Sequence, residues 1–172
     1  MDPAASRLLG ELILSRSVAS LATLHDGLPF ASMVPYAIWN DAAGERLLFV
    51  THVSRLSAHT RDMLESPRVC LLIMAAEAEA ASDSDPVPPQ ALPRVSIPAV
   101  AEFIDRDHPD HAGLARAYLT KFPSAADWFQ LGDFSIVAFT PSGSARFVAG
   151  FARAMTVSAL QLEAAVSLAG QG

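Results

Sequence analysis

The sequence lacks several features that mark common protein classes. It has one cysteine, Cys70, so no disulfide can form within the chain, and the apolar neighbours of Cys70 predict a buried thiol in a reducing compartment. Only 12 residues are Lys or Arg against 18 Asp and Glu, and the net charge of -6 argues against a nucleic-acid partner or an anionic membrane surface. No apolar run approaches the roughly 20 residues of a membrane span. No leader pattern opens the chain, so we expect a cytoplasmic protein without a membrane partner.

Motifs that carry well-known chemistry are also missing. There is no Gly-x-Ser-x-Gly nucleophile motif, and no glycine-rich loop of the mononucleotide or dinucleotide binders. His108 and His111 have the spacing of a ligand pair at a helix start, but no third ligand follows at a diagnostic distance, so we predict no metal site. What the chain does have is 51% apolar residues, enough for the core of a single domain over residues 1–172.

The hydrophobic pattern predicts an α+β fold with a largely antiparallel sheet or small barrel, because strands predominate and do not alternate regularly with helices. Residues 75–93 combine alanine, four acids and several prolines, which predicts a mobile loop within the domain. The predicted helices are 2–16, 54–66, a helix that starts at Asp107 and ends at Lys121, 125–131 and a C-terminal helix within 156–172. The predicted strands are 18–24, 29–39, 47–50, 69–74, 94–104, 134–139 and 146–151.

The segment from Thr51 to Asp62 is the strongest candidate site. It follows the apolar run 47–50 and places hydroxyl, imidazole and guanidinium groups where a helix is predicted to begin. Helix N-termini present unpaired backbone N–H groups and a favourable dipole end to anions, and Ser54 and Arg55 add side-chain donors. Two interpretations stay open: a phosphate cradle, or an ordinary capped helix followed by a solvated arginine.

Two further groups have both a structural and a functional interpretation. His59 lies close to the helix face that presents Arg55, so it either reaches a ligand or is a partly buried histidine bonded to the backbone. Trp39, Trp128 and Phe129 either stack on a planar ligand or belong to the core, as aromatic residues at helical spacing more often do.

Several motifs together resemble the pyridoxamine 5′-phosphate oxidase-like FMN-binding split-barrel family, and most closely its branch of HugZ-type haem-utilisation proteins. The matching motifs span about residues 17–155 and are Ala19-Ser20-Leu21-Ala22-Thr23, Ala31-Ser32-Met33-Val34-Pro35-Tyr36, Ser54-Arg55-Leu56-Ser57-Ala58-His59-Thr60-Arg61-Asp62, Ser66-Pro67-Arg68-Val69, Leu131-Gly132-Asp133-Phe134 and Gly150-Phe151-Ala152-Arg153-Ala154. They are more specific for the fold than for a reaction.

The resemblance implies a six-stranded antiparallel split barrel with flanking helices, which forms a homodimer and holds FMN at the subunit interface. The strand segment beside the flavin, which would contact it mainly through its backbone, would be Ser32, Met33, Val34, Pro35 and Tyr36. The phosphate would be held by Thr51, His52, Ser54 and Arg55, with His59 and Thr60 near it. The partner chain would contribute Trp128 and Gln130.

Three departures from the family pattern bear on activity. Arg146-Phe147-Val148 does not supply the Arg-x-His pair that binds the substrate phosphate in the vitamin B6 oxidases, and no histidine follows His111 to act as the C-terminal haem ligand of HugZ-type proteins. Asp62 stands where Asn is common. Its negative charge weakens the proposed phosphate site unless Arg55 or Arg61 pairs with it.

These observations favour an FMN-dependent oxidoreductase whose substrate is unknown. In such a protein the flavin supplies the redox chemistry, and the chain supplies binding and orientation. The alternatives are a non-enzymatic haem or flavin binder of the haem-utilisation type, and a dimer that has kept the barrel without a cofactor.

Overall fold

The computed structural model describes residues 1–41, 46–77 and 88–171. The helices are α1 (Pro3–Ser15), α2 (Ala58–Glu65), α4 (His111–Lys121) and α5 (Ala159–Ala169), with 3-10 helices η1 (Pro89–Ala91) and η2 (Pro123–Gln130). The strands are β1 (Val18–His25), β2 (Leu28–Pro35), β3 (Ala37–Asn40), β4 (Leu47–Ser54), β5 (Arg68–Met74), β6 (Arg94–Ile104), β7 (Phe134–Pro141), β8 (Ala145–Val148) and β9 (Ala154–Val157). The fold is α+β, as predicted.

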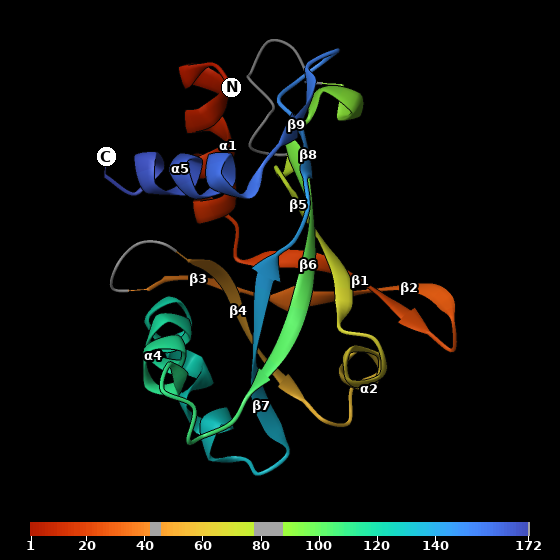
Figure 1. Ribbon diagram of the computed structural model, residues 1–172, viewed down its shortest axis with the longest axis vertical. Coiled ribbons are helices and arrows are strands. Elements are labelled where there is room, and N and C mark those ends of the chain that lie inside the picture. The colour runs from red at the N-terminus through yellow and green to blue at the C-terminus, as the bar shows by residue number, and fades with distance from the viewer. Residues whose placement is uncertain (42–45, 78–87, 172) are drawn as a thin grey trace.

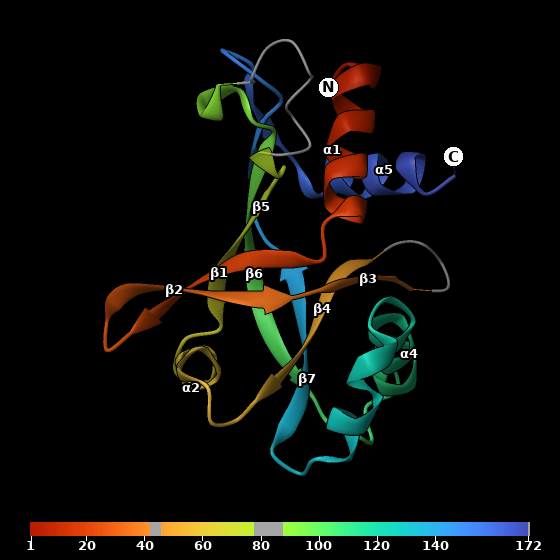
Figure 2. The ribbon, with the colours of Figure 1, turned by 180° about the vertical axis from the view of Figure 1, so that it is seen from behind.

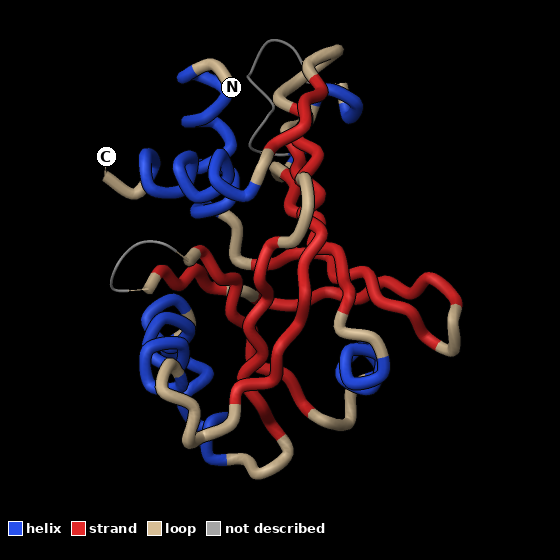
Figure 3. Tube along the Cα trace, in the orientation of Figure 1, coloured by secondary structure: helices blue, strands red, loops and turns tan. Residues whose placement is uncertain are grey.

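In the described part of the chain, nine strands form one sheet in which every pairing is antiparallel. The main path runs β2-β1-β5-β6-β7-β4-β3, and β8 pairs with β6 and β9. The two ends of the path, β2 and β3, are consecutive in the chain with only Tyr36 between them, so the sheet curls round on itself (Figure 1). The tube in Figure 3 shows the sheet as the central body, with helices at its periphery. The expectation of six strands is therefore wrong in number, while the antiparallel barrel-like arrangement is confirmed.

Local capping signals set the ends of the two terminal helices. Asp2 accepts a hydrogen bond from the Ala5 N–H at 2.9 Å and Pro3 occupies the first turn, while Ser158 and Gln161 form a capping box. The two helices pack against each other on one side of the sheet, as both ribbon views show (Figures 1 and 2). They approach so closely at Gly10 that a Cβ there would lie 2.1 Å from the Ala165 carbonyl oxygen.

Two hydrophobic clusters hold the layers together. The larger cluster joins α1 and α5 to the sheet around residues such as Leu9, Phe49 and Phe139. The smaller cluster packs α4 on β3, β4 and β7 through Leu114 and Tyr118. Strand β5 lies between β1 and β6, and its residues alternate between buried and partly exposed. Cys70 is on the partly exposed face and is only half-buried, so the prediction of a buried thiol is wrong.

The largest change from the sequence prediction lies between β4 and α2. The strand predicted for 47–50 continues to Ser54, because Thr51 to Ser54 pair with Phe134 to Val137 of β7. Helix α2 consequently begins at Ala58 and not at residue 54, with Ser57 as its N-cap residue. The prediction placed a helix N-terminus at Ser54, and this is wrong because ladder pairing with a distant strand extends β4.

Other boundaries also differ. The run 29–39 is divided at Tyr36, whose N–H donates to the Ser17 carbonyl and whose hydroxyl donates to the Ile13 carbonyl. Helix α4 begins at His111 and not at Asp107, and 125–131 is the 3-10 helix η2. Strand β8 ends at Val148, and the unpredicted β9 follows a turn in which Ala152 has a φ of 57°. Of the loop predicted for 75–93, residues 78–87 lie outside the described residues.

The β1–β2 hairpin extends away from the body of the molecule, with α2 lying beside it (Figure 1). Its two-residue turn, Asp26-Gly27, has φ values of 50° and 76°, as a type I′ turn requires. Strand β2 is at one end of the sheet path, and much of it is exposed on both faces. The hairpin therefore presents an edge strand and apolar side chains to its surroundings. No helix in the described ranges is long and apolar enough to span a bilayer.

Candidate ligand-binding site

Two neighbouring hollows contain most of the residues that the sequence singles out. The first, which we call the β2 hollow, has a volume of about 270 Å³ and is lined by Met33, Val34, Pro35, His52, Val53, Ser54, Ser57, His59, Tyr118, Trp128 and Phe134. The second, the α4 hollow, has a volume of about 740 Å³ and is lined by His52, Arg55, Ile104, Asp105, Arg106, His111, Leu119, Phe129, Gln130, Gly132, Phe134, Ser135 and Ile136. His52 and Phe134 line both hollows, which are therefore adjacent.

The β2 segment predicted to run beside a cofactor lies partly at the β2 hollow. Met33, Val34 and Pro35 line it, and the Met33 side chain is 62% exposed. Tyr36 is different: it is fully buried, its hydroxyl donates to the Ile13 carbonyl at 2.6 Å, and burial raises its pKa. The structure therefore brings three of these residues to the hollow and places Tyr36 in the core.

Among the predicted phosphate ligands, Ser54 is already engaged within the chain. Its hydroxyl donates to the Asp133 carboxylate at 2.8 Å and accepts from the Leu56 N–H, while the Arg55 N–H donates to the Asp133 carbonyl. Thr60 is buried, and its hydroxyl donates to the Ser54 carbonyl at 2.7 Å. These bonds fix the turn between β4 and α2, and they place a carboxylate where the sequence predicts an anion.

Thr51 and His52 lie within β4 and not at a helix terminus. Both are buried, and no described group forms a hydrogen bond with the Thr51 hydroxyl or with His52 Nδ1. The His52 ring stacks on Phe129 with centroids 3.9 Å apart and an interplanar angle of 9°. Burial, with a smaller effect from His111, lowers the pKa of His52 to about 4, so the imidazole is neutral near pH 7.

Arg55 and Gln130 lie at the α4 hollow and not at the β2 hollow. Arg106, His111 and Asp105 line the same hollow, and none of the three was predicted as a ligand residue. Asp105 and Arg106 directly follow β6, and His111 begins α4. Strand β6 pairs with β7, which pairs with β4, and α4 packs on β3, β4 and β7. Only the His108-His111 spacing drew attention to this region, as a possible metal pair.

His59 projects from the first turn of α2 and lines the β2 hollow. Its Nδ1 atom lies 3.1 Å from the Ser32 hydroxyl oxygen on β2. Burial lowers the pKa of His59, although the charge of Asp62 acts in the opposite direction. Trp128, which is 49% exposed, and Phe134 also line this hollow, with ring centroids 6.5 Å apart. The β2 hollow thus contains both an imidazole and aromatic side chains.

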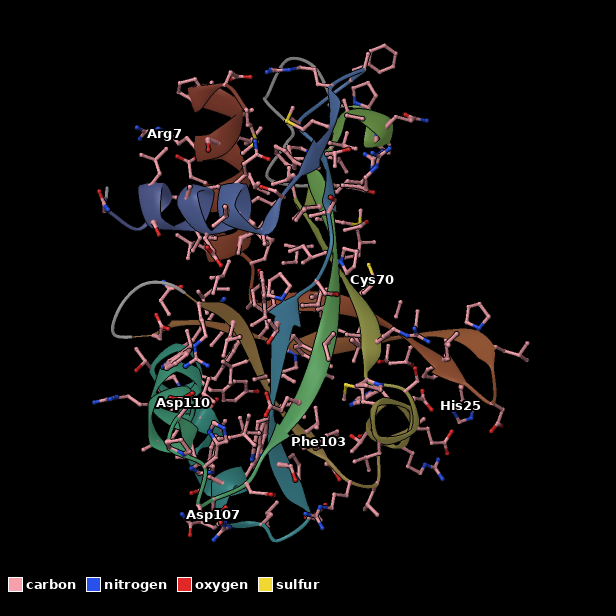
Figure 4. The ribbon with its side chains drawn as sticks, viewed as in Figure 1. Arg7, His25, Cys70, Phe103, Asp107 and Asp110 are labelled. Atoms are coloured by element: carbon pink, nitrogen blue, oxygen red, sulfur yellow. The ribbon has the colours of Figure 1, made fainter. Side chains whose placement is uncertain are left out.

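Asp62 has partners other than the arginines that the sequence suggested. It is only 2% exposed, and its carboxylate accepts from the Thr23 hydroxyl and lies against His25 Nδ1, both at 2.7 Å. Burial alone raises the pKa of Asp62, but the hydrogen bonds from His25 and Thr23 bring it below its ordinary value. Figure 4 shows His25 between the hairpin and α2. The described ion pair of Asp62 is with His25 and not with Arg55 or Arg61.

Comparisons with known proteins agree with this architecture. The sequence profile of the family described as "Pyridoxamine 5'-phosphate oxidase" matches residues 7–145. Among curated proteins, the "Non-canonical heme oxygenase HOZ, chloroplastic" of Arabidopsis thaliana is 33% identical over 137 residues, which are 80% of this chain and 37% of that protein.

Two solved structures extend the comparison. A heme binding protein from Mycobacterium smegmatis superposes with a TM-score of 0.77 at 28% identity, covering 95% of this chain and 62% of that one. HutZ, the heme storage protein of Vibrio cholerae, gives 0.64 at 23% identity over 78% of this chain and 88% of its own, and shares the fold. The chain thus spans less than two thirds of the length of the plant and mycobacterial proteins.

Proposed function

The chain belongs to the pyridoxamine 5′-phosphate oxidase family, and from that membership and the site geometry we propose that it is a haem-binding protein of the haem-utilisation type. The names of its relatives support this proposal, since the plant protein is called a heme oxygenase and the mycobacterial protein a heme binding protein. The proposed binding site is the β2 hollow together with the residues around His52 that connect it to the α4 hollow.

The observation that carries the proposal is the contrast between the hollow and the predicted phosphate cradle. The Ser54 hydroxyl donates its hydrogen bond to the Asp133 carboxylate, so a carboxylate of the chain occupies the position expected for a phosphate. Two anions at that position repel each other. The walls of the β2 hollow are by contrast largely apolar or aromatic, with Met33, Pro35 and Trp128 among them. Such walls suit a large, flat and mostly apolar ligand.

The charged edge of haem has a counterpart nearby. Haem carries two carboxylates on one side of an otherwise apolar ring system, and Arg55 and Arg106 border the adjoining α4 hollow. A guanidinium binds a carboxylate through paired hydrogen bonds, so these arginines are the residues that would hold the carboxylates. When bound, haem supplies a redox-active iron, and the chain would orient the ring and exclude water from its face.

FMN is the second candidate ligand, because β2 is the end strand of the sheet path. Within the described residues β2 pairs only with β1, which leaves backbone N–H and C=O groups along its outer edge. These groups suit the hydrogen-bonding edge of a flavin ring. In this alternative the protein is an FMN-dependent oxidoreductase, and Met33 to Pro35 contact the flavin.

We also propose that the protein is a homodimer whose second copy completes the site. The β2 hollow is open, and its volume of about 270 Å³ lies below the roughly 300–1,000 Å³ of typical ligand pockets. Large apolar side chains are also exposed elsewhere on the hairpin and on α2, among them Leu28 at 69% and Leu64 at 64%. Sedimentation velocity tests this proposal: a monomer at all micromolar concentrations, with and without haem, would contradict it.

A titration with two ligands tests the function. We expect ferric haem added to the purified protein to give a shifted, saturable Soret band at one haem per chain, and FMN to give no saturable change at micromolar concentration. The variant Trp128→Ala removes part of the aromatic wall and should weaken haem binding about tenfold, or ~1.4 kcal/mol. Phe151→Ala is the matched control, because Phe151 is 76% exposed and lies outside both hollows.

The possible results separate the candidates. Saturable FMN binding without a Soret shift would replace haem by FMN as the ligand. If neither ligand binds, both proposals fail. Equal weakening by Trp128→Ala and Phe151→Ala would place haem away from the β2 hollow.

A further inference from the structure

Histidine is a common protein ligand of haem iron. The sequence has five histidines, and the structure describes all of them. His25 faces Asp62 through Nδ1, and its Nε2 lies 3.8 Å from Asp26. His108 Nδ1 accepts from the Asp110 N–H at 3.1 Å, and His108 lines neither hollow. These two are therefore poor candidates.

His111 lies on the α4 hollow among charged side chains and does not line the β2 hollow. His52 lines both hollows, but its ring is stacked on Phe129 and its Nδ1 atom has no hydrogen-bond partner among the described residues. A metal-bound histidine usually donates its other ring N–H to a fixed acceptor, which sets the tautomer and orients the ring. His52 has no such acceptor in the described structure.

His59 has this second partner. Its Nδ1 atom lies 3.1 Å from the Ser32 hydroxyl, and the side chain lines the β2 hollow. When Nδ1 carries the proton and donates it to Ser32, the lone pair of Nε2 is available to a metal. The described residues provide no hydrogen bond to Nε2.

We propose that Nε2 of His59 is the axial ligand of the haem iron and that Ser32 is the residue that positions the ring. This inference rests on the proposed haem-binding function. It assigns an iron-binding role to a residue that the sequence placed near an FMN phosphate. Met33 is the rival ligand within the same hollow, because a thioether also binds haem iron and its side chain is 62% exposed.

Resonance Raman and absorption spectra of the ferrous haem complex test the assignment. We expect the wild-type complex to show an iron–histidine stretching band. His59→Gln should lose this band, because glutamine fills similar space without an imidazole, and added imidazole should restore a five-coordinate histidine-like spectrum. His111→Gln and Met33→Leu should keep the band, and circular dichroism checks that each variant is folded.

Ser32→Ala provides a second readout that does not depend on losing the ligand. It should keep the band but shift its frequency, because the hydrogen bond to Nδ1 is removed, and it should weaken haem binding by about tenfold. If His59→Gln does not fold, this frequency shift still tests the assignment. An unchanged band in Ser32→Ala would then overturn it.

Failure of the ligand assignment can be distinguished from failure of the proposed function. If haem binds at one per chain but His59→Gln keeps the band, only the assignment of His59 is wrong. If Met33→Leu alone changes the spectrum, the ligand is Met33. If the wild-type protein gives no saturable Soret shift, the proposed function fails and the assignment fails with it.

Discussion

Two histidine contacts tie helix α2 to the β1–β2 hairpin, and they differ in kind. At one, His25 of β1 meets the buried carboxylate of Asp62, which also accepts from Thr23. At the other, His59 of α2 meets the neutral hydroxyl of Ser32 on β2. At the first contact, one carboxylate oxygen lies against His25 and the other accepts from Thr23. The second contact involves only Nδ1 of His59, so Nε2 is left for a ligand in the β2 hollow. The first contact thus fastens the helix, and the second orients a side chain toward the proposed ligand site.

Opposite changes in pKa accompany this difference. The hydrogen bond and charge of Asp62 raise the pKa of His25, which stabilises its charged form. Burial lowers the pKa of His59 and outweighs the attraction of the same carboxylate. Direct hydrogen bonding thus makes Asp62 the dominant influence on one ring, and burial dominates the other.

Asp62→Ala should have the largest effect on stability. It leaves the buried Thr23 hydroxyl without its acceptor and removes the counterion of His25, so we expect a loss of about 2–3 kcal/mol in the free energy of unfolding. Urea unfolding measures this loss. Asp26→Ala is the matched control, because Asp26 is exposed and its oxygen lies 3.8 Å from His25, and its effect should stay within about 0.5 kcal/mol. Equal losses in the two variants would contradict the fastening role of Asp62.

Some features of the fold depend only on neighbouring residues. The turn Asp26-Gly27, the N-cap of Asp2 and the capping box at Ser158 each involve residues no more than three positions apart, so each can be recognised in the sequence. The antiparallel α+β fold also followed from the order of elements. Such signals are local, and short-range geometry alone determines them.

Features that were not predicted from the sequence, such as the end of β4, the partner of Asp62 and strand β9, depend on pairing between distant segments. Strand β4 reaches Ser54 because it pairs with β7, about 80 residues later in the chain, so the helix could not begin at residue 54. Asp62 pairs with His25, 37 positions away, and not with the nearby Arg55 or Arg61. Strand β9 exists because β8 offers an edge to it. The ligand-binding role of the thirteen predicted residues remains a prediction, and ligand-binding measurements test it.

A smaller effect is expected from the charge of His25, and it depends on pH. A histidine whose pKa is above 6.5 in the folded chain stabilises the fold fully below that pH, and this contribution is lost as the pH rises through the folded pKa. Asp62 remains ionised in this range because its pKa is lowered. We therefore expect the stability difference between wild type and His25→Gln to be larger at about pH 5.5 than at about pH 8.5.

Measuring a difference between variants is necessary because other histidines act in the opposite sense. His52 and His59 have lowered pKa values, so their contributions are lost as the pH falls, and they are common to both proteins. Urea unfolding of wild type, His25→Gln, Asp62→Asn and the double variant at both pH values completes the test. The pH-dependent difference should vanish when Asp62→Asn is the background. If it persists there, His25 is stabilised by Asp26 and not by Asp62.

The smallest effect on stability should come from Ser32→Ala, although it removes the contact that we propose orients the His59 ring. The hydrogen bond between Ser32 and His59 joins two neutral, half-buried groups, so its removal should lower the free energy of unfolding by no more than about 1 kcal/mol. Urea unfolding without ligand measures this, with exposed Ser20 on β1 changed to alanine as the control. A loss as large as that of Asp62→Ala would mean that the Ser32 contact also fastens the helix, and the division between a fastening contact and a ligand-facing contact would be wrong.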